Sequence, residues 1–244
     1  MSTKTVGKAT AVGPILGPVE IRPTDAARLY THVHPMLLLA GYFFQFRSIV
    51  ADPVLALTSG LLPLSVLQIS YLITCLPVAG TGSTAASLRQ GQRKKTGAGK
   101  NELNLGDRIV PALISFVLSF AFGAPVIAIL LVLLGAPFTT HQAHTLLCAA
   151  HMSLLITSPL VYVHGVDAGT WQEIVALQAP LDDVFGSAIG TLAGAWLGAI
   201  PIPLDWDREW QKWPVTIVTG AYLGCVAGKL AGTYLFKGSR IKLS

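Results

Sequence analysis

The sequence "GSAIGTLAGAWLG" at residues 186–198 has a spacing of glycines that returns in "GAYLGCVAGKLAG" at residues 220–232. Both segments place glycine at every fourth position, at Gly186, Gly190, Gly194 and Gly198 and at Gly220, Gly224, Gly228 and Gly232. Four residues are slightly more than one helical turn, so each series forms a smooth stripe along a helix. In lipid, such stripes let helix backbones approach closely. The two series therefore predict a tight helical hairpin, and the alternative is that a stripe faces a helix of another protein.

The composition of the chain supports a membrane setting for this hairpin. Of 244 residues, 52% are hydrophobic and 12% are charged, whereas a soluble domain carries about 25% charged residues. Mean hydropathy is +0.60. Six apolar segments have the length that a membrane-spanning helix needs, and they are residues 35–50, 55–78, 109–134, 145–163, 184–202 and 215–236. The sequence predicts an all-α membrane protein whose residues 35–236 form one six-transmembrane-helix bundle.

Lysine and arginine are unevenly distributed between the two sides of this bundle. The segment 1–34, the loop 80–106, the loop between the fourth and fifth spans, and the tail 237–244 share one side. Thirteen of the seventeen basic residues lie there, namely Lys4, Lys8, Arg22, Arg28, Arg89, Arg93, Lys94, Lys95, Lys100, Arg108, Lys237, Arg240 and Lys242. The positive-inside rule places this side, with both termini, in the cytosol. The loop 80–106 is then a basic, flexible cytosolic segment. The favoured interpretation is a solvated loop that only fixes the topology, and the alternative is that its "RQGQRKK" contacts anionic lipid headgroups.

Tryptophan and charge alternate in the turn at residues 203–214, which the same topology places in the lumen. The turn residues of interest are Pro203, Asp205, Trp206, Asp207, Arg208, Trp210 and Trp213. Indole rings are typical of the membrane interface, where the ring is buried and its N–H meets a polar partner. One interpretation is a rigid turn that sets the register of the two glycine series. The other is that the turn also docks a partner protein.

Lys229 is a charged residue inside the last span. A charge within the membrane is costly unless it pairs or reaches the interface. Asp182 and Asp183 begin the antiparallel fifth span at the same membrane face. We therefore expect Lys229 to reach towards Asp182 and Asp183, as a structural feature.

Histidines and acidic residues are the remaining candidates for chemistry. In "HQAHTLLCAAH", His141, His144 and His151 lie within about three turns of a helix, but no neighbouring acid or cysteine completes a metal site. Membrane-boundary or interhelical hydrogen bonding is the favoured interpretation of these histidines. His32 and His34 are expected at headgroup level. The sequence has three cysteines, Cys75, Cys148 and Cys225, and we expect all three to be buried as small hydrophobic residues.

Asp205 and Asp207 could bind a divalent ion, but no third ligand is identifiable. No motif supplies a nucleophile with its base. The sequence therefore predicts no catalytic residue, no metal site and no cofactor in this chain, and no nucleic-acid partner.

The segment from Asp183 to Leu230 resembles the PIG-F family. The resemblance rests on "GAWLGAIPIPLDWDREWQKWP" followed by "GAYLGCVAGKL"; the first four spans agree in number and length. Glu209 stands where the family pattern "DW-acid-RPWQxWP" has proline, and the 80–106 loop is long, which indicates a fungal-type member. Family members are multi-pass endoplasmic-reticulum proteins of glycosylphosphatidylinositol (GPI) anchor biosynthesis.

This resemblance implies a non-catalytic accessory subunit. Its partner would be a large multi-pass transferase that adds ethanolamine phosphate to mannoses of the GPI precursor and carries a zinc-dependent luminal domain. Two alternatives remain open from the residues. One is a stand-alone lipid-modifying enzyme that uses Asp205, Asp207 and the histidines, and the other is a small lipid transporter.

Overall fold

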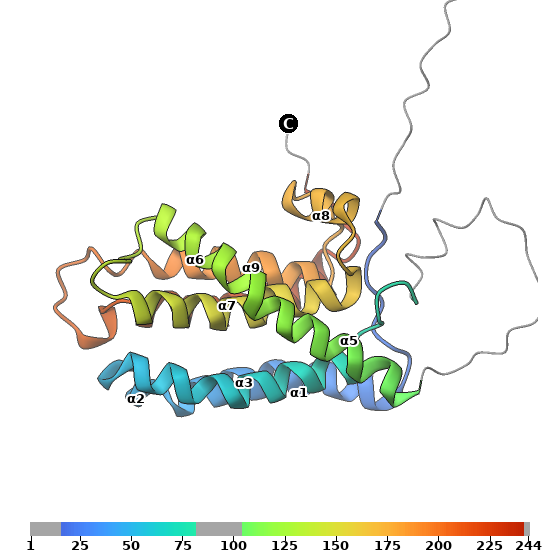
Figure 1. Ribbon diagram of the computed structural model, residues 1–244, viewed down its shortest axis with the longest axis horizontal. Coiled ribbons are helices and arrows are strands. Elements are labelled where there is room, and N and C mark those ends of the chain that lie inside the picture. The colour runs from blue at the N-terminus through green and yellow to red at the C-terminus, as the bar shows by residue number, and fades with distance from the viewer. Residues whose placement is uncertain (1–15, 82–103, 242–244) are drawn as a thin grey trace, which may run out of the picture.

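The structure is a computed structural model that describes residues 16–81 and 104–241, and every regular element in these ranges is a helix (Figure 1). The elements are α1 (Asp25–Phe44), α2 (Phe46–Ala51), α3 (Pro53–Cys75), α5 (Leu105–Leu118), the π-helix η1 (Ser119–Gly123), α6 (Ala124–Leu133), α7 (Gln142–His164), α8 (Ala168–Val175), α9 (Asp183–Gly198), the 3₁₀-helix η2 (Glu209–Gln211), α10 (Val215–Leu230) and the π-helix η3 (Ala231–Leu235). Most of the 80–106 loop, the first fifteen residues and the last three residues of the basic tail lie outside the described ranges.

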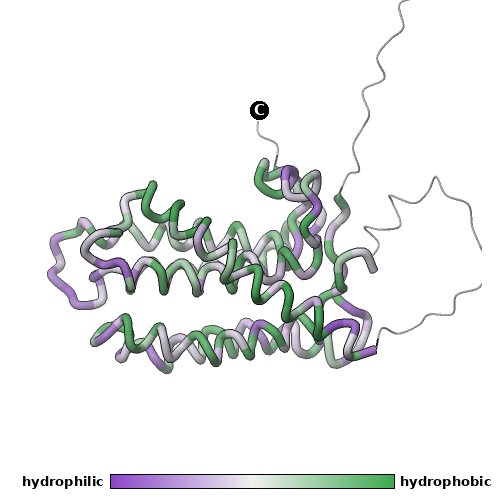
Figure 2. Tube along the Cα trace, viewed as in Figure 1, coloured by the Kyte–Doolittle hydropathy of each residue, from purple (hydrophilic) through white to green (hydrophobic). Residues whose placement is uncertain are grey.

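Four helices of the described part are long and apolar enough to cross a membrane. They are Pro53–Cys75, Leu105–Leu133, Gln142–His164 and Val215–Leu235, and they coincide with the second, third, fourth and sixth predicted spans. The first and fifth predicted spans, α1 and α9, are not among these four. Helix α9 has only 16 residues, and the first half of α1 carries the polar residues Arg28, His32 and His34. Figure 2 shows hydrophilic residues gathered towards the two ends of the helices. The chain is a multi-pass helical membrane protein.

Helix α1 does not begin where the first span was predicted. It starts at Asp25, because the Thr24 side chain caps it by accepting a hydrogen bond from Ala27 N at 3.3 Å. The boundary predicted between residues 34 and 35 marks the start of the apolar part of this helix only. The span predicted to continue to Val50 is interrupted at Gln45, after which the short α2 leads to Asp52, the cap of α3.

Helix α7 lies at the centre of the bundle. In its most apolar 18-residue window 83% of the residues are buried, against 28% in the continuous α5–η1–α6 helix. In Figure 1, α1 and α3 run side by side, and α5 continues into α6 diagonally across α7. The exposed side chains along α5 and α6 are large and apolar, including Val117, Phe122 and Leu133, as expected of a surface that faces lipid.

Helices α9 and α10 pack backbone against backbone along the two glycine series. A Cβ added to Gly190 would lie 2.7 Å from Gly228 Cα, and one added to Gly224 would lie 2.8 Å from Gly194 Cα. Real Cβ atoms essentially never come within 3.0 Å of another heavy atom, so even alanine does not fit at these positions. The faces that carry the glycines are thus covered within the chain.

We expect Gly190→Ala to destabilise the folded protein, because the added methyl group must push α9 and α10 apart. Such overpacking typically costs about 1–3 kcal/mol, and the melting temperature in detergent reports the loss. Gly41→Ala is the matched control, since Gly41 also lies in a helix but has no heavy atom within 4 Å of the added Cβ. Equal melting temperatures for the two variants would contradict the close contact.

Candidate functional site

The Trp-rich turn, residues 203–214, is held in shape by the side chain of Gln211. Its Nε2 donates to Pro201 O at 2.7 Å and to Leu204 O at 2.8 Å, and its Oε1 accepts from Arg208 N at 2.8 Å. Gln211 is buried and lies in η2. Because these three backbone groups come from different parts of the turn and its approach, this one amide holds them together. Sequence reasoning missed Gln211, although a glutamine between two tryptophans was visible.

The three tryptophans of the turn have different environments. Trp206 is 54% exposed, and its ring centroid lies 5.9 Å from that of Trp210. Trp210 and Trp213 are half-buried and pack against the hydrophobic core. Two indoles therefore anchor the turn to the bundle, while Trp206 projects from it.

The charged residues of the turn lie beside Trp206 in the sequence and are exposed. Asp205, Asp207 and Arg208 are exposed, and Lys212 forms an ion pair with Glu209. Asp207 adopts a left-handed backbone conformation with φ of 48°, which aspartate tolerates better than most residues. The turn thus presents one aromatic ring within a charged rim.

The candidate metal and acid–base residues are not gathered in one place. Within residues 16–81 and 104–241, no three His, Cys, Asp or Glu side chains lie close enough to hold a metal ion. His141 and His144 contact each other edge-on at the start of α7, with centroids 5.1 Å apart. The carboxylates of Asp205 and Asp207 belong to the exposed turn.

His151 bridges three helices. Its Nδ1 lies 2.7 Å from Tyr222 Oη of α10, and its Nε2 lies 2.9 Å from Leu57 O of α3. These contacts confirm the interpretation of His151 as an interhelical hydrogen-bonding residue. The prediction for His34 was wrong: it is buried, not at headgroup level, and stacks on Tyr71 with a centroid distance of 4.3 Å. The prediction for the cysteines is confirmed, since Cys75, Cys148 and Cys225 are all buried.

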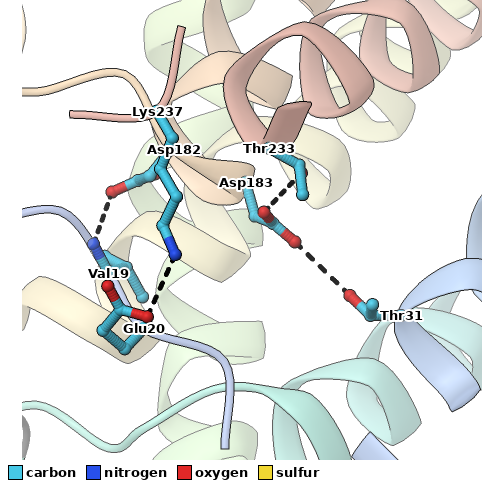
Figure 3. Close-up of polar contacts among 7 residues, drawn as sticks. All are labelled: Val19, Glu20, Thr31, Asp182, Asp183, Thr233 and Lys237. Atoms are coloured by element: carbon cyan, nitrogen blue, oxygen red, sulfur yellow. Dashed lines mark hydrogen bonds and ion pairs between the residues drawn. The ribbon is translucent and has the colours of Figure 1, made fainter. Parts of the chain in front are cut away.

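At the opposite end of the hairpin, two neighbouring carboxylates bind the ends of other segments (Figure 3). Asp182 caps α9 by accepting from Val184 N at 2.9 Å and Phe185 N at 2.8 Å, and it also accepts from Val19 N at 2.8 Å. Asp183 accepts hydrogen bonds from the Thr31 and Thr233 hydroxyl groups.

A third contact at this end is the ion pair between Lys237 Nζ and Glu20 Oε2 at 3.0 Å, drawn in the same view. Segment 16–24, α1 and η3 are therefore all tied to the first turn of α9.

The position of the Lys229 side chain differs from the predicted pairing with Asp182 and Asp183. Its side chain is buried, and its Nζ lies 3.8 Å from the centroid of the Tyr71 ring, in a cation–π contact. Neither aspartate forms an ion pair with it among the described contacts. The hydrogen bonds that the two carboxylates accept come instead from backbone N–H groups and from threonine hydroxyls.

The fold and these sites define a multi-pass helical membrane protein whose last two helices form a glycine-packed hairpin. Residues 33–233 match the family model described as GPI biosynthesis protein family Pig-F, and the chain belongs to this family. The resemblance of the hairpin segment is thereby confirmed, and it extends over most of the chain.

Three relatives from fungi carry the name glycosylphosphatidylinositol anchor biosynthesis protein 11. The chain is 44% identical to that of Aspergillus fumigatus, over 90% of this chain and 84% of the relative. It is 44% identical to that of Neurospora crassa, over 92% and 81%, and 41% identical to that of Pyricularia oryzae, over 83% and 75%. No solved structure matches the chain.

Replacing Gln211 by methionine should loosen the turn, because the carbonyl groups of Pro201 and Leu204 and the N–H of Arg208 lose their partner. A typical intramolecular hydrogen bond contributes about 0.5–1.5 kcal/mol to stability. We expect faster proteolytic cleavage within residues 203–214 of the folded protein in detergent. Glu209→Gln, an exposed change in the same element, should leave the cleavage rate unchanged. Similar rates for both variants would contradict the role of Gln211.

The Asp182 cap predicts a pH dependence of stability. Burial raises the pKa of this carboxyl from 3.8 to about 6, and the three backbone N–H donors oppose the rise only in part. The folded state therefore favours the protonated form. This contribution to stability is present at low pH and is lost as the pH rises through the window from 3.8 to about 6.

The comparison variant for this prediction is Asp182→Asn, which keeps a capping side chain without the titration. Relative to it, the melting temperature of the wild-type protein should fall between about pH 4 and pH 7. Parallel curves for the two proteins would show that Asp182 does not titrate in this way.

Proposed function

We propose that the chain is a non-catalytic accessory subunit of a GPI ethanolamine-phosphate transferase complex in the endoplasmic-reticulum membrane. Its partner is a large multi-pass catalytic subunit, which this chain binds and stabilises. Catalysis and its zinc ions belong to that partner, and this chain holds no cofactor. Membership of the Pig-F family and relatives named for GPI anchor biosynthesis support this proposal.

The proposal includes six membrane crossings, with α1 and α9 as the first and fifth. Helix α9 runs antiparallel to α10 along both glycine series, and α10 with η3 is itself long and apolar enough to span. Because α9 packs antiparallel to the spanning helix α10 along both glycine series, α9 returns the chain across the membrane. Together with the one-sided distribution of basic residues, this arrangement supports cytosolic termini and a luminal Trp-rich turn.

The docking surface for the partner is the Trp-rich turn, and the exposed Trp206 is the observation that carries this assignment. An indole ring held out by a rigid turn loses little conformational freedom on binding. Tryptophan and arginine are the residues most enriched where binding energy concentrates. The exposed Asp205, Asp207 and Arg208 around Trp206 supply a polar rim, which gives specificity and faster association rather than most of the affinity.

Trp206→Leu should weaken the complex, because truncating a central tryptophan of an interface typically costs about 2 kcal/mol or more. The measurement is recovery of a large membrane transferase with the tagged chain in mild detergent, normalised to the amount of the chain. Trp196→Leu is the control, since Trp196 is 66% exposed but lies on α9 outside the turn. We expect a several-fold loss of recovery for Trp206→Leu and little change for Trp196→Leu.

Two outcomes would contradict the proposal in different ways. Recovery of no transferase by the wild-type chain contradicts the accessory role itself. Equal recovery with the two tryptophan variants contradicts only the assignment of the turn as the docking surface. Transfer of ethanolamine phosphate by the chain purified alone would show instead that it is an enzyme.

A further inference from the structure

A small cavity lies where α1, α3, α7, α9 and α10 meet. Its volume is about 10 Å³. Its walls include His34 of α1, Gln68 and Tyr71 of α3, and Cys225 and Lys229 of α10. All five side chains are at least 94% buried. The cavity is therefore lined by buried side chains, and several polar ones contribute to its wall.

Several polar atoms of this wall have no hydrogen-bond partner in the part of the chain that the structure describes. They are both ring nitrogens of His34, Oε1 of Gln68, the hydroxyl of Tyr71 and Nζ of Lys229. Native proteins leave few buried polar atoms unpaired, because each one costs free energy when it is dry. Four such side chains around one space indicate a small polar ligand that hydrogen-bonds to several of them.

The size and chemistry of the cavity select that ligand. A single water molecule needs about 10–15 Å³ and two to four polar partners. Lysine only donates hydrogen bonds, Gln68 Oε1 only accepts, and a neutral histidine offers one donor and one acceptor. One water molecule can accept a hydrogen bond from the lysine and donate one each to the glutamine oxygen and to one histidine nitrogen. An anion is disfavoured because the Asp183 carboxylate already acts electrostatically on Lys229, and a cation is disfavoured by the ammonium group.

We propose that the cavity binds one water molecule. The water accepts a hydrogen bond from Lys229 Nζ and donates to Gln68 Oε1 and to the unprotonated nitrogen of His34. It thus links α10 to α3 and α1. This site gives Lys229 a hydrogen-bonded partner besides the Tyr71 ring, and it joins the glycine hairpin to the α1–α3 pair by a contact between buried polar groups.

The proposal can be tested with a brief X-ray pulse. The pulse forms hydroxyl radicals from bound water, and these radicals modify the side chains beside that water. The full chain is exposed in detergent, and mass spectrometry measures oxidation of two buried cysteines. Cys225 lines the cavity, whereas Cys148 is fully buried and does not. We expect Cys225 to be oxidised several-fold faster than Cys148. Equal rates would overturn the proposal.

A second experiment uses Gln68→Met, which removes the acceptor Oε1 but keeps a side chain of similar length. In Gln68→Met the water loses a partner, so oxidation of Cys225 should fall towards the rate of Cys148. Ser65→Ala is the control, because Ser65 is buried on the same helix and bonds to Leu61 O, away from the cavity. Unchanged Cys225 oxidation in folded Gln68→Met would also overturn the proposal. If that variant does not accumulate, the comparison of the two cysteines in the wild-type chain decides.

Discussion

The direct contact between the backbones of α9 and α10 is the constraint on which the other features depend. A contact of this kind tolerates no side chain, so the register between the two helices is fixed to within a fraction of a turn. That register places the Trp-rich turn at one end of the pair and Asp182 and Asp183 at the other. It also orients Tyr222 and Lys229 of α10 towards His151 and Tyr71 on neighbouring helices. In lipid, where burial of leucine gains nothing, contact of this closeness is what holds the pair together.

The parts of this fold that could be predicted from sequence are those that repeat. Apolar length predicts where spanning helices lie, and glycine spacing predicts a hairpin, because both patterns extend over many residues. The start of α1 at Asp25 depends on the single hydroxyl of Thr24, and the amphipathic helix α8 is too short to give a clear pattern. The central position of α7 was also not predictable, since its hydropathy resembles that of more exposed helices.

The candidate sites were less predictable than the fold because they depend on which atoms meet. Asp182 and Asp183 were predicted to receive Lys229, but their hydrogen-bond partners are backbone N–H groups and threonine hydroxyls. The ring of Tyr71 comes from α3, far from Lys229 in sequence, and no local pattern connects the two. Gln211 falls on the glutamine of the family pattern, but that pattern does not show that its side chain acts through carbonyl groups of the chain before it. The tryptophans, in contrast, are conspicuous because of their residue type alone.

The glycine contact also has a mechanical consequence. Two helices that touch along their backbones cannot slide or rotate independently, so the pair moves as one stiff body of about 24 Å, the length of 16 residues. A force applied to Trp206 at one end is therefore carried to Asp183 and Thr233 at the other end, where α1 is attached through Thr31. A protein bound to the Trp-rich turn would in this way tilt groups at the opposite end of the hairpin without any change in the helices themselves.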